Sequence, residues 1–293
     1  MMKKTVFGAL LLLAVSCGQE KEKPFIDVQA HRGGAGLMPE NTIPAMKNAI
    51  DLGVNTVEFD LQVTADGQVI VNHDAYFHPR YATRPDGTLI QEEDPKEYIY
   101  TMPYDSVMKY DVGLRVNDRW PTQQHFVVQR PLLSDLVDFV EDYGKHSLNY
   151  NVEIKSAEGE LEGTAWPEYH EFVDACVQIL LEKKLGDRLI VQSFDTRALE
   201  YMHERYPQLT LSYLTEGEST DVEAWMSKLS FKPVWWSPES IEVTPENVKW
   251  CHDNNILVVP WTVDEPDEMR RLVKCGVEAI ISNYPDRLIE VVR

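Results

Sequence analysis

Short apolar runs alternate with amphipathic segments along almost the whole chain after residue 24. The apolar runs are typical of buried strands, and the amphipathic segments are typical of helices with one face on a core. Strands separated by helices favour parallel β/α units, because a parallel crossover needs a long connection. The strand candidates are residues 25–30, 56–61, 69–72, 148–154, 189–194, 210–214, 233–236, 256–262 and 279–282. The helix candidates are residues 42–52, 131–143, 165–184, 196–205, 220–229, 245–254, 265–274 and 286–292.

One strand candidate, residues 69–72, differs from the others because a short turn precedes it. The turn sequence TADG at 64–67 contains Asp-Gly between two strand-like runs, which predicts a hairpin with an antiparallel second strand. Removing this strand leaves eight candidates, each followed by a helical pattern. We therefore predict an α/β fold, a single TIM (β/α)8 barrel over residues 25–293 with the hairpin across its mouth. An open doubly wound sheet is the alternative.

Residues 74–130 interrupt the alternation. They are rich in Pro, Asp, Tyr and Arg and show only weak periodicity, apart from a possible short helix at 104–110. Loops of this length inside a domain are uncommon unless they are functional. We interpret the segment as an insertion over the C-terminal face of the barrel, where barrel active sites are built.

The N-terminal segment reads as a targeting sequence rather than as part of the fold. Lys3 and Lys4 precede a short apolar run that ends before Cys17, which is the pattern of a signal peptide over residues 1–16. The sequence LAVSC at 13–17 resembles a bacterial lipobox, with Cys17 as the lipidated residue and residues 17–24 as a tether. We expect secretion across the inner membrane and a lipid anchor, periplasmic or on the cell surface. A plain cleaved secretory signal is the alternative.

The charge balance restricts the partners. The formal net charge is −20, which repels nucleic-acid backbones and disfavours electrostatic docking on anionic lipid. We therefore expect no nucleic-acid partner, and membrane contact through the lipid anchor only. The oligomeric state is left open. Cys176, Cys251 and Cys275 show no metal-ligand spacing, and we expect them to be buried and reduced, with one disulfide plus a free thiol as the alternative.

Acidic residues lie near the ends of two predicted strands. Glu58 and Asp60 are two residues apart, so they point to the same face of their strand, and Glu153 has the same placement on another strand. Inward carboxylates repel one another unless a cation or a proton is shared. The pattern predicts a divalent metal site for Ca²⁺ or Mg²⁺. Ion pairing with Lys155 and Arg32 is the alternative.

Histidines and cations occupy the same strand ends. His31 and His73 each close a strand, and they suit general acid and base roles because the imidazole pKa lies near neutral pH. A pair of structural histidines or of metal ligands is the alternative. Arg32 and Lys155 are candidate phosphate contacts in an otherwise acidic chain. Trp261, also at a strand end, is a candidate for stacking on a substrate or for core packing.

These residues belong to blocks that together resemble one known family, the glycerophosphodiester phosphodiesterases. The resemblance spans residues 30–285. Its blocks are HRG at 31–33, PENT at 39–42, EFD at 58–60, TADG at 64–67, VNHD at 71–74, EIK at 153–155, QSF at 192–194 and WTV at 261–263. Two blocks depart from the family pattern: Ser282-Asn283-Tyr284-Pro285 stands where Thr-Asp often precedes a proline, and His78-Pro79-Arg80-Tyr81 stands where an Arg-Thr stretch is usual.

The resemblance implies a TIM barrel, a divalent metal on Glu58, Asp60 and Glu153, and acid–base catalysis by His31 and His73. It also implies phosphate contacts from Arg32 and Lys155, a pocket wall at Trp261, and a bracing role for Glu40 and Asn41. The implied reaction hydrolyses a small-molecule glycerophosphodiester to glycerol phosphate and an alcohol. The alternatives are a phospholipase-type phosphodiesterase acting on intact lipid and a lipoprotein that binds phosphodiesters without turnover.

Overall fold

The computed structural model describes residues 25–217 and 220–293. The predicted signal peptide at 1–16, the tether at 17–24 and the lipidated Cys17 lie outside the described residues. Among the residues described, no helix combines the length and the apolarity that a bilayer crossing requires.

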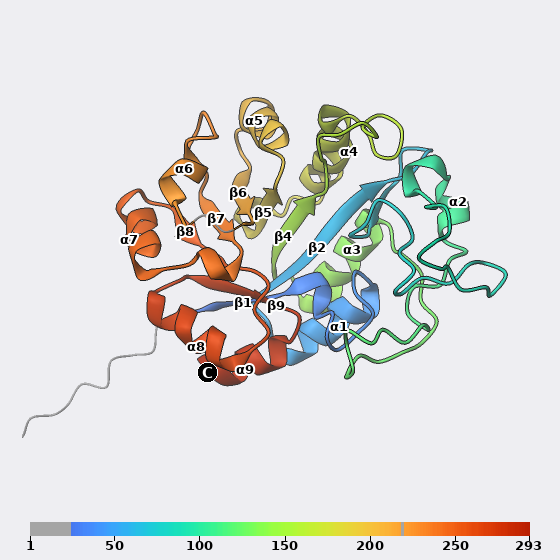
Figure 1. The fold of residues 1–293 in the computed structure, drawn as a ribbon, viewed down its shortest axis with the longest axis horizontal. Coiled ribbons are helices and arrows are strands. Elements are labelled where there is room, and N and C mark those ends of the chain that lie inside the picture. The colour runs from blue at the N-terminus through green and yellow to red at the C-terminus, as the bar shows by residue number, and fades with distance from the viewer. Residues whose placement is uncertain (1–24, 218–219) are drawn as a thin grey trace, which may run out of the picture.

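Parallel strands form the centre of the molecule (Figure 1). Their order in the sheet is β8-β7-β6-β5-β4-β2-β1-β9, and all pairs along this path are parallel. The bounds are β1 Asp27–Ala30, β2 Thr56–Val63, β4 Asn149–Ile154, β5 Leu189–Ser193, β6 Thr210–Thr215, β7 Trp235–Pro238, β8 Leu257–Val258 and β9 Ala279–Ser282.

Backbone hydrogen bonds bring the two end strands together. The N–H of Glu278 donates to the carbonyl of Val258 (3.2 Å), that of Ile281 to Pro260 (3.0 Å), and that of Val263 to Ile281 (2.9 Å). The predicted barrel is thus confirmed, and the open doubly wound sheet is wrong. Strand β8 is shorter than the predicted 256–262 because Pro260 has no N–H for the ladder.

The predicted hairpin is also present. Strand β3, Val69–Val71, pairs antiparallel with β2, with Leu61 opposite Val71 and Val63 opposite Val69. Gly67 in the turn has a φ of +75°, a conformation that glycine adopts without strain.

Helices surround the strands in the order expected for β/α units (Figure 1). Thr42, Asp195 and Thr244 cap α1, α5 and α7 by accepting a backbone N–H. Helix α4 begins later than the predicted residue 165 because Pro167 disfavours helical backbone at the residue before it. The bounds are α1 Ile43–Leu52, α3 Leu133–Gly144, α4 Tyr169–Glu182, α5 Thr196–Arg205, α6 Val222–Met226, α7 Pro245–Asp253, α8 Pro266–Cys275 and α9 Pro285–Val292.

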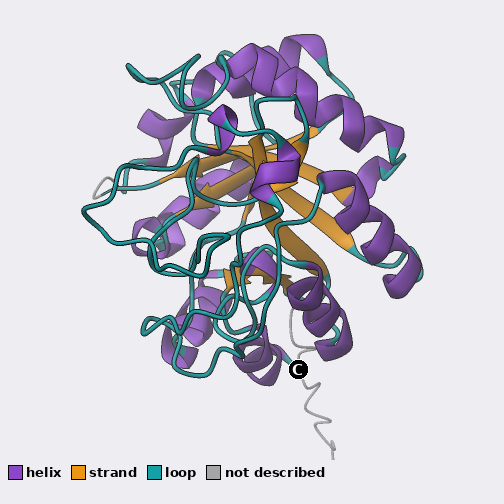
Figure 2. Cartoon of the chain, turned by 90° about the vertical axis from the view of Figure 1, so that its right-hand side faces the viewer, coloured by secondary structure: helices purple, strands orange, loops and turns teal. Residues whose placement is uncertain are grey.

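The segment between β3 and α3 packs around a small core of its own. It contains a 3-10 turn at Ile99–Thr101 and helix α2, Tyr104–Val107, where a short helix was expected. Phe77 stacks on Tyr110 with ring centroids 3.9 Å apart, and Ile90 and Ile99 are buried in the same cluster. Loops make up most of the face seen in Figure 2. The three cysteines within the described residues are free; Cys176 and Cys251 are buried as expected, whereas Cys275 is half-buried.

Candidate active site

The strand ends surround a cavity of about 460 Å³. The barrel brings together residues separated by more than 200 positions in the chain, as the sequence predicted. The predicted site residues on the cavity wall are His31, Arg32, Glu58, His73, Glu153, Lys155 and Trp261.

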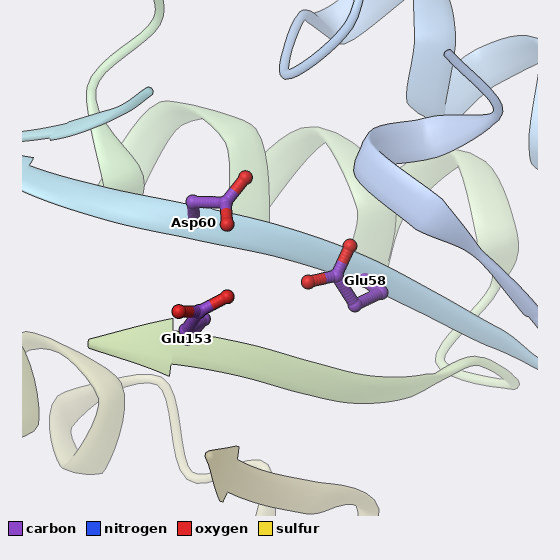
Figure 3. Close-up of side chains that lie close together, drawn as sticks. All are labelled: Glu58, Asp60 and Glu153. Carbon is purple, nitrogen blue, oxygen red and sulfur yellow. The ribbon is translucent and has the colours of Figure 1, made fainter. Parts of the chain in front are cut away.

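Three buried carboxylates lie beside one another on neighbouring strands (Figure 3). Glu58 and Asp60 come from β2, and Glu153 comes from β4, where it pairs in register with Asp60. One oxygen from each of the three lies within 4.8 Å of the others. The spacing within β2 explains the arrangement, because residues two apart share a face of a strand.

The carboxylates differ in electrostatic environment. Burial and the neighbouring Asp60 raise the pKa of Glu58 well above its usual value. Burial likewise raises the pKa of Glu153, although Lys155 opposes the rise. Burial would also raise the pKa of Asp60, but His73, Arg32 and Lys155 outweigh it and lower that pKa. Asp60 is therefore held ionised, whereas ionisation of all three together requires a compensating cation.

The loop after β1 fits closely beneath the site. Arg32 adopts a left-handed conformation (φ +53°), and its backbone N–H donates to Glu58 Oε2 at 2.8 Å. Gly33 follows with a φ of +80°, and a Cβ at this position would lie 2.7 Å from the Cβ of Ala45. The close approach of the loop to α1 thus requires glycine.

Glu40 and Asn41 form hydrogen bonds to Arg32 and Asp60 of the site. Glu40 Oε1 accepts from Arg32 Nη1 at 2.9 Å. Asn41 Nδ2 donates to Asp60 Oδ2 at 2.7 Å, and Asn41 Oδ1 accepts the N–H of Asp60 at 3.3 Å. Arg130, buried at 1% exposure, donates through Nη1 to the carbonyl of Glu40. These contacts match the bracing positions expected for Glu40 and Asn41 and add Arg130, which the sequence patterns did not indicate.

Asn283 and Asp264 fix the orientation of His31. Asp264 accepts from the N–H and the Nδ2 of Asn283 at 2.9 and 2.8 Å, so the amide oxygen must face the other way. That oxygen lies 2.7 Å from His31 Nδ1, which must therefore carry the proton. Burial and Arg32 lower the pKa of His31 well below its usual value. His31 is thus a neutral imidazole with Nε2 able to accept a proton.

His73 is held by a carboxylate instead of an amide. Its Nδ1 lies 3.1 Å from Asp74 Oδ1, and Asp74 Oδ2 accepts from the hydroxyl of Tyr81 at 3.0 Å. On the other side of the ring, Nε2 lies 3.0 Å from Lys155 Nζ. The sequence predicts the strand-end position of His73, but it does not predict that Tyr81, from the insertion, holds the Asp74 carboxylate in place.

Lys155 and Trp261 complete the wall. Lys155 Nζ donates to Glu153 Oε1 at 2.7 Å; burial would lower the pKa of Lys155, but Glu153 and Asp60 outweigh it and raise that pKa. The indole N–H of Trp261 donates to the carbonyl of Ser237 at 2.9 Å, and its ring meets Phe194 edge to face at 5.4 Å. Trp261 is half-buried, so part of its ring is open to the cavity.

Comparison with known proteins agrees with this geometry. The family described as the glycerophosphoryl diester phosphodiesterase family matches residues 31–287. Glycerophosphodiester phosphodiesterases from Caldanaerobacter subterraneus subsp. tengcongensis and Bacillus subtilis are each 28% identical, over 91% and 88% of this chain and 97% and 83% of theirs. A crystal structure from Silicibacter pomeroyi DSS-3, provisionally named a glycerophosphoryl diester phosphodiesterase, has a TM-score of 0.82 at 28% identity, covering 92% of this chain and 93% of that one.

Proposed function

The chain belongs to the glycerophosphoryl diester phosphodiesterase family, which makes it a phosphoric diester hydrolase, and we propose that it splits glycerophosphodiesters into glycerol phosphate and an alcohol. The observation that carries the proposal is the meeting of His31 and His73 with Glu58 and Glu153 on the wall of one cavity, where the two carboxylates cluster with the buried Asp60. A protein that only binds phosphodiesters, the alternative from another class, would have no use for two imidazoles held in defined orientations.

The carboxylates Glu58, Asp60 and Glu153 would hold a divalent cation. Asp60 Oδ1 is buried and accepts no hydrogen bond, which fits an oxygen that faces a metal. An all-oxygen donor set is typical of Ca²⁺ or Mg²⁺ rather than of zinc. When bound, the cation supplies positive charge that polarises the phosphate and offsets its growing negative charge.

The chain's own residues bind the phosphate and move the protons. Arg32 and Lys155 are placed to contact its non-bridging oxygens. His31 Nε2 takes a proton from the attacking hydroxyl, since burial and Arg32 lower the pKa of His31 and keep its ring neutral. His73 is assigned the other role, giving a proton to the departing alkoxide, and the contact of its Nδ1 with Asp74 Oδ1 at 3.1 Å holds the ring in position. One P–O bond forms and one breaks, and the alcohol leaves neutral.

The first experiment measures release of glycerol phosphate from purified protein and a panel of glycerophosphodiesters, with Ca²⁺, with Mg²⁺ and with a chelator. We expect release that the chelator abolishes and one of the two metals restores. Release that a chelator leaves unchanged would refute the metal site, and no release with any metal would refute the substrate class.

The histidines are tested separately. His31→Ala and His73→Ala should each lower kcat by on the order of 10²–10⁴-fold, the range for loss of a general acid or base. His252→Ala is the matched control, because its Nε2 lies 2.8 Å from Glu278 Oε1 and the residue does not line the active-site cavity. Near-normal turnover by both site variants would overturn the assignment.

An intact-lipid substrate is the second candidate. The cavity wall includes the apolar side chains of Phe194, Leu214 and Trp261, which suit an acyl-bearing glycerol as well as a bare one. Hydrolysis of micellar phospholipid that exceeds hydrolysis of the deacylated diester would favour this candidate. The reverse ranking would favour the free diester.

A further inference from the structure

A second, smaller cavity of about 80 Å³ adjoins the active site. It shares Arg32, His73 and Arg119 with the main cavity. The two cavities therefore meet at these residues, beside the proposed phosphate position. The rest of its wall comes from the segment between β3 and α3, apart from Glu40, which precedes α1. A substrate phosphate bound at Arg32 would therefore have one ester arm in each cavity.

The acidic groups on this wall already have partners. Glu40 is ion-paired with Arg32 at 2.9 Å. The two oxygens of Asp74 are occupied by His73 and by the hydroxyl of Tyr81. No carboxylate on the wall of the second cavity is thus left to attract a cationic head group.

Two basic groups on the same wall, Arg80 and Arg119, have no acidic partner among the described residues. Across residues 25–217 and 220–293, neither Arg80 nor Arg119 forms an ion pair, although the chain has 48 acidic residues against 28 basic ones. Arg84, in the same segment, is paired with Asp94 and Glu97 at 2.7 and 2.6 Å. Arg115 forms no ion pair within the described residues but donates through Nη1 to the carbonyl of Ile90 at 2.8 Å, whereas the guanidinium groups of Arg80 and Arg119 donate no hydrogen bond there.

Neighbouring side chains leave further donors available on the wall. Asn117 Oδ1 accepts the N–H of Arg119 at 3.1 Å, so its amide nitrogen remains for another acceptor. His78 Nδ1 accepts the N–H of Arg80 at 3.0 Å, which puts the ring proton on Nε2. Arg119 lies over the ring of Trp120 at 4.7 Å, which restrains its position.

We propose that this cavity is the leaving-group subsite and that it selects diesters whose leaving alcohol carries a second negative charge, such as a phosphate. The inference rests on the proposed hydrolysis of glycerophosphodiesters. Arg80 and Arg119 bind the anionic substituent, while Asn117 and His78 donate hydrogen bonds to it. His73, on the boundary of the two cavities, is next to the ester oxygen that departs.

The test compares three diesters that differ in the charge of the leaving alcohol. These are glycerophosphoinositol, which is neutral there, glycerophosphoinositol 4-phosphate, which is anionic, and glycerophosphocholine, which is cationic. We expect kcat/KM for the anionic diester to exceed that for the neutral one by about tenfold, the effect of one or two charge-assisted hydrogen bonds at a partly exposed site. Salt should reduce the advantage, since exposed charges are screened.

Substitutions test whether the second cavity causes the preference for the anionic diester. In the Arg80→Gln, Arg119→Gln double variant, the ratio of the anionic to the neutral diester should fall to near one. Lys109→Gln removes an exposed charge from the same insertion but lines neither cavity, and it should keep the wild-type ratio. An equal loss of the ratio in Lys109→Gln, or an unchanged ratio in the double variant, would overturn the proposal.

A binding measurement separates this inference from the proposed function. Calorimetric titration with inositol 4-phosphate, and with inositol as the uncharged control, requires no turnover. Binding of the phosphate to the wild type, lost in the double variant, supports the subsite even if no diester is hydrolysed. Absence of binding together with equal hydrolysis of all three diesters would leave the proposed function intact and refute the subsite.

Discussion

His31 owes its orientation to a residue that makes no contact with the cavity. Asp264 holds Asn283, and Asn283 holds His31, so the tautomer of this imidazole is set two side chains away. The carboxylate accepts hydrogen bonds only, and this leaves one orientation for the amide and one for the imidazole. The ring is neutral because burial and the nearby Arg32 lower the pKa of His31, and these effects outweigh the hydrogen bond to Asn283, which raises it.

Asn283→Ala should therefore lower kcat by about 10–100-fold, because the ring loses its orienting partner. Metal affinity should be unchanged, since Glu58, Asp60 and Glu153 are untouched; metal titration and steady-state kinetics measure the two effects. Ser282→Ala is the matched control, because its hydroxyl donates to the same Asp264 at 3.2 Å and does not contact His31. Wild-type kcat in Asn283→Ala would show that the relay has no catalytic role.

The sequence predicts a site residue when its role follows from local spacing along the chain, and fails to predict it when the role depends on distant partners. The carboxylates of β2 follow from a period of two, and the basic and histidine positions follow from strand ends. Arg130 and Asp264 gave no such signal, because their roles depend on partners distant in sequence, Glu40 and Asn283, that only the closed barrel brings near. Asn283 was visible as a departure from the family pattern, but its effect on His31 was not.

At the scale of elements, the junction of β1 and α1 has little tolerance for change. Gly33 combines a left-handed backbone with contact against Ala45, whereas Gly67 in the hairpin turn has a similar φ of +75° and open space around it. Substituting each glycine therefore distinguishes the cost of backbone strain, present at both positions, from the cost of a steric clash, present only at Gly33.

Gly33→Ala should lower the free energy of unfolding by about 2–5 kcal/mol, from strain plus overpacking. Gly67→Ala should lower it by only about 1–2 kcal/mol, from strain alone. Denaturant unfolding of both variants measures the difference. Equal losses would mean that the loop moves away from α1 at little cost.

A buried acid outside the candidate active site lies in the short 3-10 turn Ser240–Glu242 that follows β7. Glu242 is fully buried and accepts from the hydroxyl of Thr215 at 3.1 Å, while that hydroxyl accepts from the indole of Trp236 at 3.0 Å. Burial raises the pKa of Glu242 to about 7 from 4.5. Between these two pH values the folded protein keeps a proton that the unfolded chain releases, so the stability contributed by this group is lost as pH rises.

Glu242→Gln removes the titration and keeps the shape of the side chain. Relative to the wild type, the variant should gain on the order of 1–3 kcal/mol of unfolding free energy between pH 4.5 and pH 8. Denaturant unfolding across this range measures the gain. A difference between the two proteins that does not vary with pH would mean that Glu242 titrates normally in the fold.

The order and type of the elements follow from hydrophobic periodicity, whereas several of their ends do not. Pro260 shortens β8 because it has no N–H to donate, and Pro167 delays the start of α4. Hydrophobic periodicity contains no information on either effect. The path of the chain between β3 and α3 was not predictable, because its core forms from contacts such as Phe77 with Tyr110, across a segment without period.

At the scale of the whole molecule, the distribution of charge differs between the surface and the candidate site. The chain has a formal net charge of −20, yet Arg32, Lys155, Arg80 and Arg119 meet at the two adjoining cavities. With a divalent cation offsetting Glu58, Asp60 and Glu153, these basic side chains would attract an anionic substrate that most of the surface repels. The same acidity bears on localisation, because it opposes adsorption to anionic membranes.

A covalent lipid at Cys17 would therefore be the main source of membrane retention, and we predict that the wild type stays in the membrane fraction after a high-salt wash. Cys17→Ser should move the protein to the soluble fraction, whereas Cys275→Ser, a cysteine within the barrel, should not. Fractionation of cells expressing each form measures retention, and protease treatment of intact cells locates the anchored protein at the cell surface or within the periplasm. Wild-type protein found free in the secreted fraction would indicate the cleaved signal instead, and Cys17→Ser protein that remains membrane-bound would point to a contact made by the folded domain.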